Sequence, residues 1–447
     1  GTDTLACDAS AGSAFTGTVA VGQGQFPLSG DNTVALTNTT LQVDAGNITT
    51  VAATDQSIGN LTLNGGTMAW SGQTPPQMPA GIVNVTDLTL NSGTVQLDVP
   101  VTNGVPNPVP APGLNLLAQD DGEIQAQLVA ASGTVTGDAS SLGLVDSSGQ
   151  SVGNPQTLAI TEGVSTVANA SYDFMLTTGS NNDGLYLGYG LKGLDLLSGQ
   201  TLHLAPDGGA ASGSAALNAL VTGTGNLEVN GSASGDQTLT ISNASNSYTG
   251  TTTVSGGTLV AGSDNALGAT SELVLQDTTG FDLNGKTQTL GSLSGAAGST
   301  LNVNSGNLTL SQGGQSEGAL TGAGNLTVND GSLTVSGANT GLSAAVILNN
   351  TAQAVLDDVA GLGTGSVNLN GAGTGVQLTG ETGTLANALS GTGSASVLGS
   401  SDVLLSGNNS GFSGHYVVDN TSNLTASTAQ NLGSASISND GALTLNS

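Results

Sequence analysis

A chain of 447 residues with 70 glycines, 37% hydrophobic residues and only 2% aromatic residues does not have the composition of an ordinary globular domain. Its net charge of -29, from 31 acidic residues against Lys192 and Lys286, disfavours nucleic acids, anionic polymers and anionic membranes as partners, because phosphate groups are neutralised by Lys and Arg. Regularly spaced Leu, Ile and Val exclude general disorder, and the single Cys7 excludes an intrachain disulfide.

The predicted elements begin with short strands of period two in the N-terminal part. The segments GNLTLNGG at 59–66 and TDLTLNSGTVQLDV at 86–99 alternate apolar and polar residues. Between them lies TMAWSGQTPPQMP, with Trp70 beside Met68 and Met78. A Trp in this position either fills a core or a cap, or offers a ring surface to a ligand.

Residues 98 to about 210 interrupt this pattern. Five of the 11 prolines lie between Pro100 and Pro112, where they exclude a helix and a central strand. Farther on, alternating apolar residues flank SNNDG at 180–184 and predict a β-hairpin. Four of the 11 aromatic residues fall within a single stretch of 18 residues that includes the turn of this hairpin: Tyr172, Phe174, Tyr186 and Tyr189. They either pack the hairpin onto the rest of the protein or form a stacking surface for sugar rings or for another protein.

The C-terminal part consists of repeated segments. When residues 336–366 are aligned with residues 406–436, at a fixed offset of 70, ten of 31 positions are identical. The identical positions include Asn339 and the dipeptide Leu362–Gly363. A third copy begins near Ser242 and has Tyr248 at the position that Leu342 takes in the copy at 336–366. If 70 residues correspond to three coils, each coil has about 23 residues.

Strands of three to five residues bury little apolar surface alone, so each repeat needs its neighbours. Stacking each strand on its equivalent in the next coil buries Leu and Val and leaves Thr, Ser and Asn outside. The low aromatic content and the directional repeat favour a parallel β-solenoid over a β-sandwich. We therefore expect an all-β fold with three parts: N-terminal β-helix coils with a cap at 1–97, an irregular Pro-containing segment with the aromatic hairpin at 98–210, and regular repeat coils at 211–447.

Several of these segments resemble the passenger domains of classical autotransporters of Gram-negative bacteria. NSYTGTTTVSGGTLVAGSDNALG at 246–268 and FDLNGKTQTLGSLSG at 281–295 together resemble the autotransporter-associated repeat. YLGYGLKGLDLLSGQTLHL at 186–204 resembles self-associating, diffuse-adherence-type adhesins. The resemblance implies a right-handed three-sided parallel β-helix at the cell surface, exported across the outer membrane by a barrel domain that is not present in this chain. It also implies a role in adhesion, autoaggregation or biofilm formation.

The residue types that enzymes use on β-helices are scarce. Polysaccharide lyases need a strong base, usually Arg or Lys, and this chain has no Arg and two separated Lys. The adjacent acidic pairs Asp120–Asp121 and Asp357–Asp358 are either solvated turns or cation sites, and neither has the spacing of a calcium loop. His203 and His415 stand alone in the sequence. We therefore expect no catalytic residue, no metal site and no cofactor.

The sequence thus predicts a non-enzymatic adhesin whose partner is the same protein on neighbouring cells or a glycan or protein of a host or matrix. Stacked coils set Thr over Thr and Asn over Asn, and such ladders either bind a partner or only stabilise the solenoid. The candidate ligand-binding residues are Trp70, Tyr172, Phe174, Tyr186 and Tyr189. Two alternatives remain open: a carbohydrate-binding or polysaccharide-degrading solenoid with a groove near residues 68–80 and 172–190, and a structural stalk for a distal domain. Nucleic acid binding and membrane insertion are not expected.

Overall fold

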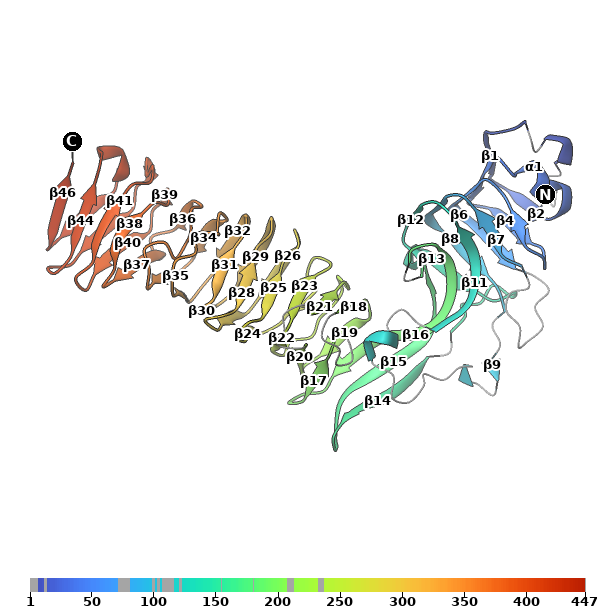
Figure 1. Ribbon diagram of the computed structural model, residues 1–447, viewed down its shortest axis with the longest axis horizontal. Coiled ribbons are helices and arrows are strands. Elements are labelled where there is room, and N and C mark those ends of the chain that lie inside the picture. The colour runs from blue at the N-terminus through green and yellow to red at the C-terminus, as the bar shows by residue number, and fades with distance from the viewer. Residues whose placement is uncertain are drawn as a thin grey trace. The chain divides into compact units, whose positions relative to one another are not determined.

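The structure is a computed structural model that describes residues 7–11, 14–70, 81–98, 101–102, 105–106, 116–119, 123–153, 155–179, 181–206, 213–231 and 237–446. These residues form β-strands far more than helices, which confirms the predicted all-β class. Two compact units make up the chain: residues 1–157 with 171–192, and residues 158–170 with 193–447 (Figure 1). Within the described ranges no helix is long and apolar enough to cross a membrane.

The first unit begins with parallel coils. The strands β1 (Thr18–Val21), β3 (Thr40–Asp44), β6 (Asn60–Trp70) and β8 (Leu88–Gln96) lie side by side in one sheet. Leu41 opposes Leu61, and Leu61 opposes Leu88, so identical buried side chains stack from coil to coil. On a second face, β2 (Gly24–Leu28) pairs with β4 (Asn47–Val51), which pairs with the last residues of β6.

The remaining elements of this part of the chain are short. They are η1 (Ala9–Ala11), α1 (Gly30–Ala35), β5 (Gln56–Ser57), β7 (Val83–Val85), β9 (Val101–Thr102), β10 (Val105–Pro106), η2 (Leu116–Gln119), β12 (Val135–Gly137), η3 (Ala139–Ser141) and β13 (Leu142–Val145). The strands β9 and β10 pair antiparallel with each other, inside the Pro-containing segment.

A second sheet contains the predicted hairpin. Its strand order is β14 (Gln156–Glu162), β15 (Ser165–Thr177), β16 (Gly184–Leu196), β11 (Glu123–Ala131), β7 and β5. The strands β15 and β16 are neighbours and flank the predicted turn, as the alternating pattern indicates. The pairing of β11 with β16 is antiparallel and shifts register twice, whereas β11 pairs with β7 in parallel.

The second unit is a parallel solenoid with three faces (Figure 1). The first face contains β17 (Thr201–Leu204), β20 (Asn226–Asn230), β22 (Thr252–Gly256), β24 (Glu272–Leu275), β27 (Ser292–Gly295), β30 (Gly313–Ser316), β33 (Ser332–Val335), β35 (Gln353–Leu356), β37 (Gly375–Thr379), β40 (Ser394–Leu398), β43 (His415–Val418) and β45 (Ser436–Asn439). The second face contains two sheets. They consist of β18 (Gly213–Leu217), β21 (Gln237–Ile241), β23 (Thr258–Ala261), β25 (Gly280–Asp282), β28 (Thr300–Asn302) and β31 (Ala319–Thr321), then β38 (Thr382–Leu385), β41 (Asp402–Leu405), β44 (Asn423–Ala426) and β46 (Ala442–Leu445).

The third face completes the coils. Its strands are β26 (Thr287–Leu290), β29 (Gly306–Leu310), β32 (Gly324–Val328), β34 (Ala345–Asn349), β36 (Val367–Asn370), β39 (Leu389–Gly391) and β42 (Gly411–Phe412). The remaining strand, β19 (Leu220–Gly223), pairs with the end of β16, and a short helix η4 spans Ala429–Asn431. In the middle coils the chain visits the three faces in a fixed order, so the predicted three-sided parallel β-helix is confirmed.

The coil length differs from the sequence-based value. Along the first face, successive partners are separated by 25 residues over the first two steps, as in Thr201↔Asn226. Farther on the separation is 19 to 22 residues, as in the pairs Ser332↔Gln353 and Gln353↔Gly375. The offset of 70 therefore exceeds three coils: it carries β33 on the first face onto β41 on the second face. In the region of the 70-residue repeat the expected 23-residue coil was wrong, because the repeated motif forms a corner of the solenoid and one corner motif can serve any of the three faces.

Two features of the motif explain these corners. Gly363 has φ 66°, and a Cβ there would lie 2.1 Å from the carbonyl oxygen of Leu342, so only glycine fits. The buried Asn339 accepts a hydrogen bond from the N–H of Leu320 in the preceding coil (2.8 Å) and donates one to the carbonyl of Gly361 in the next coil (2.8 Å). One asparagine thus ties three coils together at each such corner.

Candidate functional site

The four aromatic residues of the hairpin lie inside the first unit. Their exposed fractions are between 2% and 9%, and the rings of Phe174 and Tyr189 meet edge to face with centroids 5.2 Å apart. The Tyr186 hydroxyl donates to Asp183 Oδ1 (2.7 Å) and accepts from Gln127 Nε2 (2.9 Å). Burial, followed by the hydrogen bond to Asp183, raises the pKa of Tyr186 to about 12. These rings therefore pack within the sheet and present little surface to solvent.

Trp70 is similarly enclosed. Its side chain is 6% exposed, and its indole N–H donates to the carbonyl of Gly81 at 3.1 Å. Met68 on the same strand is fully buried, whereas Met78 lies outside the described residues. Trp70 therefore occupies a packed position at the end of β6, separate in sequence from the hairpin residues. Ligand binding by Trp70, Tyr172, Phe174, Tyr186 and Tyr189 stays a prediction.

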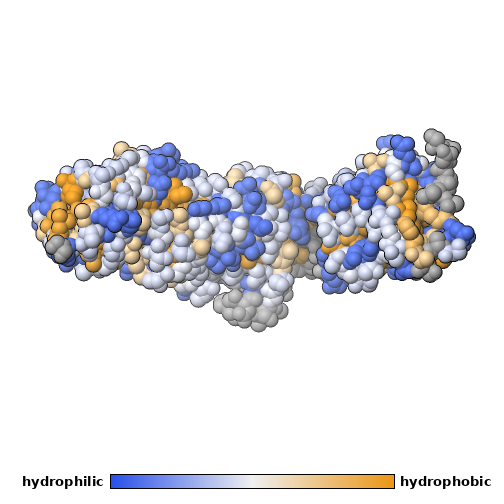
Figure 2. Space-filling view, turned by 90° about the horizontal axis from the view of Figure 1, so that it is seen from above, coloured by the Kyte–Doolittle hydropathy of each residue, from blue (hydrophilic) through white to orange (hydrophobic). Residues whose placement is uncertain are grey.

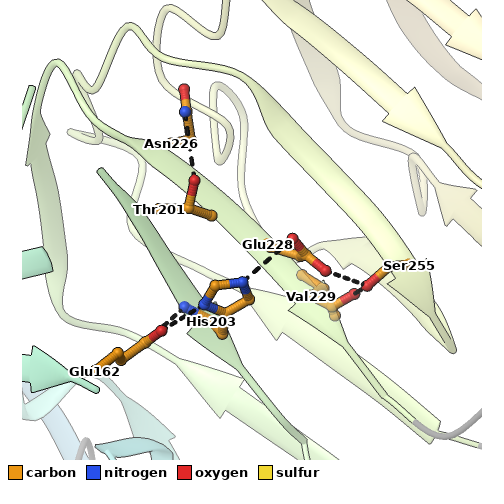
Figure 3. Close-up of polar contacts among 7 residues, drawn as sticks. All are labelled: Glu162, Thr201, His203, Asn226, Glu228, Val229 and Ser255. Carbon is orange, nitrogen blue, oxygen red and sulfur yellow. Dashed lines mark hydrogen bonds and ion pairs between the residues drawn. The ribbon is translucent and has the colours of Figure 1, made fainter. Parts of the chain in front are cut away.

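A group of ionisable side chains lies in the second unit, around His203 (Figure 3). His203 on β17 is the direct cross-strand partner of Glu228 on β20, and its Nε2 lies 3.4 Å from Glu228 Oε2. On its other side, His203 Nδ1 contacts a carboxylate oxygen of Glu162, which is on β14, and the His203 backbone N–H donates to Glu162 Oε1 at 2.9 Å. Beyond Glu228, the Ser255 hydroxyl donates to Glu228 Oε1 at 2.6 Å.

The geometry of this cluster limits its chemistry. A serine nucleophile needs a hydrogen bond to a histidine that acts as its base, but Ser255 donates to Glu228 and not to His203. Both ring nitrogens of His203 face carboxylates, so the protonated ring can donate to both at once. The side chains are 40% exposed for His203, 32% for Glu162 and 26% for Glu228. The arrangement is suited to fastening the end of β14 to the first coil strands of this unit.

The other ionisable candidates have ordinary partners. His415 Nδ1 lies 2.7 Å from Ser436 Oγ. Asp357 accepts a hydrogen bond from the Ser336 hydroxyl, and Asp358 from the N–H of Ala360. Burial, with the charges of this acidic pair, raises the pKa of the nearby Glu381. Asp120–Asp121 lies outside the described residues, and among the residues that the structure describes no group of three His, Cys, Asp or Glu could hold a metal ion.

The predicted ladders of polar side chains are present. On the third face, Asn349 Nδ2 donates to Asn329 Oδ1 (3.0 Å), and Asn370 Nδ2 donates to Asn349 Oδ1 (3.0 Å). The same arrangement joins Asn325 to Asn307 at 2.6 Å. In the view of Figure 2, hydrophilic and neutral residues cover most of the visible surface, and hydrophobic residues form separate patches. Asn329 and Asn349 are partly exposed and Asn370 is exposed, so this ladder lies at the surface of the solenoid.

The corner asparagines were not singled out from the sequence as a class. Asn246 accepts a hydrogen bond from the N–H of Val221 and donates one to the carbonyl of Ala266. Asn409 likewise accepts one from the N–H of Leu389 and donates one to the carbonyl of Asn431. Asn339 and Asn409 coincide at the 70-residue offset, which was the available signal. Asn246 is displaced by one residue from that alignment, because Tyr248 follows it after two positions whereas Leu342 follows Asn339 after three.

Comparison with known proteins supports an exported solenoid. Residues 232–261 match the model of the passenger-associated-transport-repeat family, and this segment includes Asn246 and Tyr248. The chain is 39% identical over 97% of its length to an uncharacterized lipoprotein, YdeK, of Escherichia coli strain K12, of which the match covers 33%. It is 42% identical over 80% of its length to an uncharacterized protein, YuaQ, of the same organism, of which the match covers 26%.

The chain therefore spans a third or less of the length of these relatives. No solved structure matches it. The repeat match indicates an autotransporter passenger and agrees with a surface-exposed or exported protein.

Proposed function

We propose that this chain is part of the passenger of a bacterial autotransporter and acts as a non-enzymatic adhesin in adhesion, autoaggregation or biofilm formation. The observation that carries the proposal is the Asn ladder on the third face of the solenoid, Asn329–Asn349–Asn370. The passenger repeat at 232–261 supports display at the cell surface. The partner is the same protein on a neighbouring cell, or a glycan or protein of a host or matrix.

The ladder leaves hydrogen-bonding capacity for such a partner. A primary amide has two donor hydrogens and an oxygen with two lone pairs. Asn349 uses one hydrogen toward Asn329 and one lone pair toward Asn370, which leaves one of each. Each further hydrogen bond contributes only about 0.5–1.5 kcal/mol. Repetition along the solenoid and among many copies on a cell converts these weak contacts into strong attachment.

The proposal is tested with bacteria that display the chain through the transport domain of an autotransporter. We expect displaying cells to sediment as aggregates or to adhere to epithelial cells or matrix-coated surfaces. A variant with Asn329→Ala, Asn349→Ala and Asn370→Ala should lose most of that attachment at equal surface level. The matched control is the pair Asn408→Ala and Asn420→Ala, which changes exposed asparagines outside the ladder. Equal attachment by the ladder variant and the wild type would overturn the assignment of this face.

Labelled cells without the protein separate the two kinds of partner. Homophilic contact keeps such cells out of the aggregates, whereas a receptor on the bacterial surface brings them in. A complete lack of aggregation and adhesion by well-displayed protein would overturn the adhesin proposal itself.

The non-enzymatic part of the proposal rests on side-chain chemistry. The sequence contains no Arg, and Ser255 is not bonded to His203. Incubation of the purified chain with polygalacturonate and other acidic polysaccharides should release neither unsaturated products nor new reducing ends. Their release would overturn this part and favour a polysaccharide-degrading solenoid.

A further inference from the structure

The strand β14 forms the outer edge of its sheet. Its pairing partner is β15, to which it is joined by the two-residue turn Gly163–Val164, and no described strand pairs with its other edge (Figure 1). Its residues from Thr157 to Ala159 are exposed, and Val164 at the turn is 102% exposed. Alternate N–H and C=O groups of such an edge point away from the sheet and can pair with another strand.

The usual protections of an exposed edge are missing from β14. Natural edge strands carry Lys, Pro or inward-pointing charges that prevent pairing with another chain. The segment from Gln156 to Thr161 has no charged residue and no proline, although the whole chain has a net charge of -29. The one carboxylate of the strand, Glu162, contacts the ring of His203. Pro155 stands immediately before the strand, and the turn follows it, so these features set the limits of the open edge.

The sequence of this edge is nearly symmetric about Ala159. It runs Thr157, Leu158, Ala159, Ile160, Thr161, so reading it backwards gives the same order of polar, aliphatic and small side chains. Two antiparallel copies centred on Ala159 would place Thr157 opposite Thr161 and Leu158 opposite Ile160. A twofold interface requires this kind of self-complementarity, and Thr–Thr and aliphatic pairs are favourable cross-strand neighbours.

We propose that β14 is a self-association edge, at which two copies of this chain pair antiparallel about Ala159 and join their sheets. The partner is a second copy, because the edge is uncharged where two acidic molecules must approach and because its sequence matches its own reversed order. The pairing does not depend on the proposed adhesion through the Asn ladder, which uses a different strand and a different face. Since each copy carries a large negative charge, the dimer should strengthen as salt rises.

The test is sedimentation velocity of the purified full chain over a range of protein concentrations, from low salt to physiological salt. We expect a reversible monomer–dimer equilibrium, because edge pairing alone buries little area. Ala159→Glu and Ala159→Lys each place like charges opposite each other at the twofold axis, so each variant alone should dimerise about fivefold more weakly or worse. A mixture of the two variants places Glu opposite Lys and should restore the dimer.

The mixture separates loss of pairing from loss of folding, since unfolded chains would not recover when combined. The matched control is Ala338→Glu, the same change at an exposed position of the solenoid, which should dimerise like the wild type. A strict monomer under all conditions, or a dimer that Ala159→Glu does not weaken, would overturn the proposal. A dimer that requires Asn349 and not Ala159 would assign self-association to the ladder face, and aggregation of displaying cells tests the adhesin proposal separately.

Discussion

At the scale of single residues, Asp419 is a carboxylate that accepts hydrogen bonds from two turns of the chain. Its Oδ2 accepts from the N–H of Gly399 at 2.7 Å, and its Oδ1 accepts from the N–H (3.0 Å) and the hydroxyl (2.9 Å) of Thr421. The bond from Gly399, with that from the Ser422 hydroxyl, holds the pKa of Asp419 far below its usual range. The carboxylate thus links the turn after β40 to the turn after β43.

Asp419→Asn should therefore loosen this corner in a pH-dependent way. A carboxylate whose pKa is depressed by folding contributes stability above its unfolded pKa of about 3.9, and that stability is lost as the pH falls toward the folded value. We expect faster hydrogen exchange in peptides covering Gly399 at pH 7 in the variant, after correction for intrinsic rates. The difference from the wild type should shrink below about pH 4. The control is Asp440→Asn, and a pH-independent difference would contradict the account.

His203 allows a second prediction at this scale. His203→Gln removes the ring whose two nitrogens contact Glu162 and Glu228, and leaves these two carboxylates near each other without that ring. Partly exposed ion pairs contribute at most about 1 kcal/mol, so hydrogen exchange in β14 should accelerate by up to about fivefold. Adding Glu162→Gln should reverse part of the effect, because it removes one of the like charges.

The matched control for His203 is His415→Gln. The ring of His415 contacts Ser436 and not a carboxylate, so the exchange of β14 should be unchanged by that substitution. If both histidine variants affect β14 equally, or neither does, the fastening role of His203 is wrong.

At the scale of elements, the corners of the solenoid depend on buried asparagines and its faces on stacked aliphatic residues. Asn409 is fully buried and bonds the N–H of Leu389 (2.7 Å), the carbonyl of Asn431 (2.6 Å) and the hydroxyl of Tyr416 (3.2 Å). Each of these groups belongs to a different strand or turn. The asparagine therefore holds together segments that the strands themselves leave unpaired at the corner.

Asn409→Ala should be much more destabilising than a change in the exposed ladder. It leaves the buried N–H of Leu389 without a partner and leaves the carbonyl of Asn431 with only the longer bond from the Tyr416 hydroxyl (3.4 Å). The expected cost is about 2–3 kcal/mol in the free energy of unfolding. Asn349→Ala interrupts a partly exposed ladder that water can replace, and should cost about 1 kcal/mol or less. Urea unfolding followed by circular dichroism compares the two variants. Equal losses would show that corner and ladder asparagines contribute alike.

The strands themselves were predictable, because their signal is local. The alternation of Leu326 and Val328 with polar residues fixes which side chains point inward, and both are buried. The hydrogen-bond partners of the corner asparagines were not predictable. A hydrogen bond such as that from the N–H of Leu389 to Asn409 joins residues 20 positions apart, and no local sequence pattern marks it. For the same reason His203 seemed isolated in sequence, although Glu162 lies 41 residues before it and Glu228 is its cross-strand partner.

At the scale of the whole solenoid, each coil contacts mainly the coils before and after it. Folding stability then approximates a sum over coils and their interfaces, so a complete coil can be removed without loss of the fold. Ser292–Gln312 is such a coil and contains β27, β28 and β29, one strand for each face. Its deletion joins Gly291 to Gly313 and brings β24 next to β30, β25 next to β31 and β26 next to β32.

In the shortened chain the inward side chains still stack, because Phe281 meets Leu320 where each formerly met Leu301. We expect a folded protein whose β-sheet circular dichroism per residue and melting temperature stay close to those of the full chain. Deleting only Ser292–Leu301 is the matched control: it removes about half a coil, shifts the strands to other faces and should melt far earlier or not fold. If the complete-coil deletion fails as badly as the partial one, stability does not reside in interchangeable coils, and long-range coupling along the solenoid must hold it together.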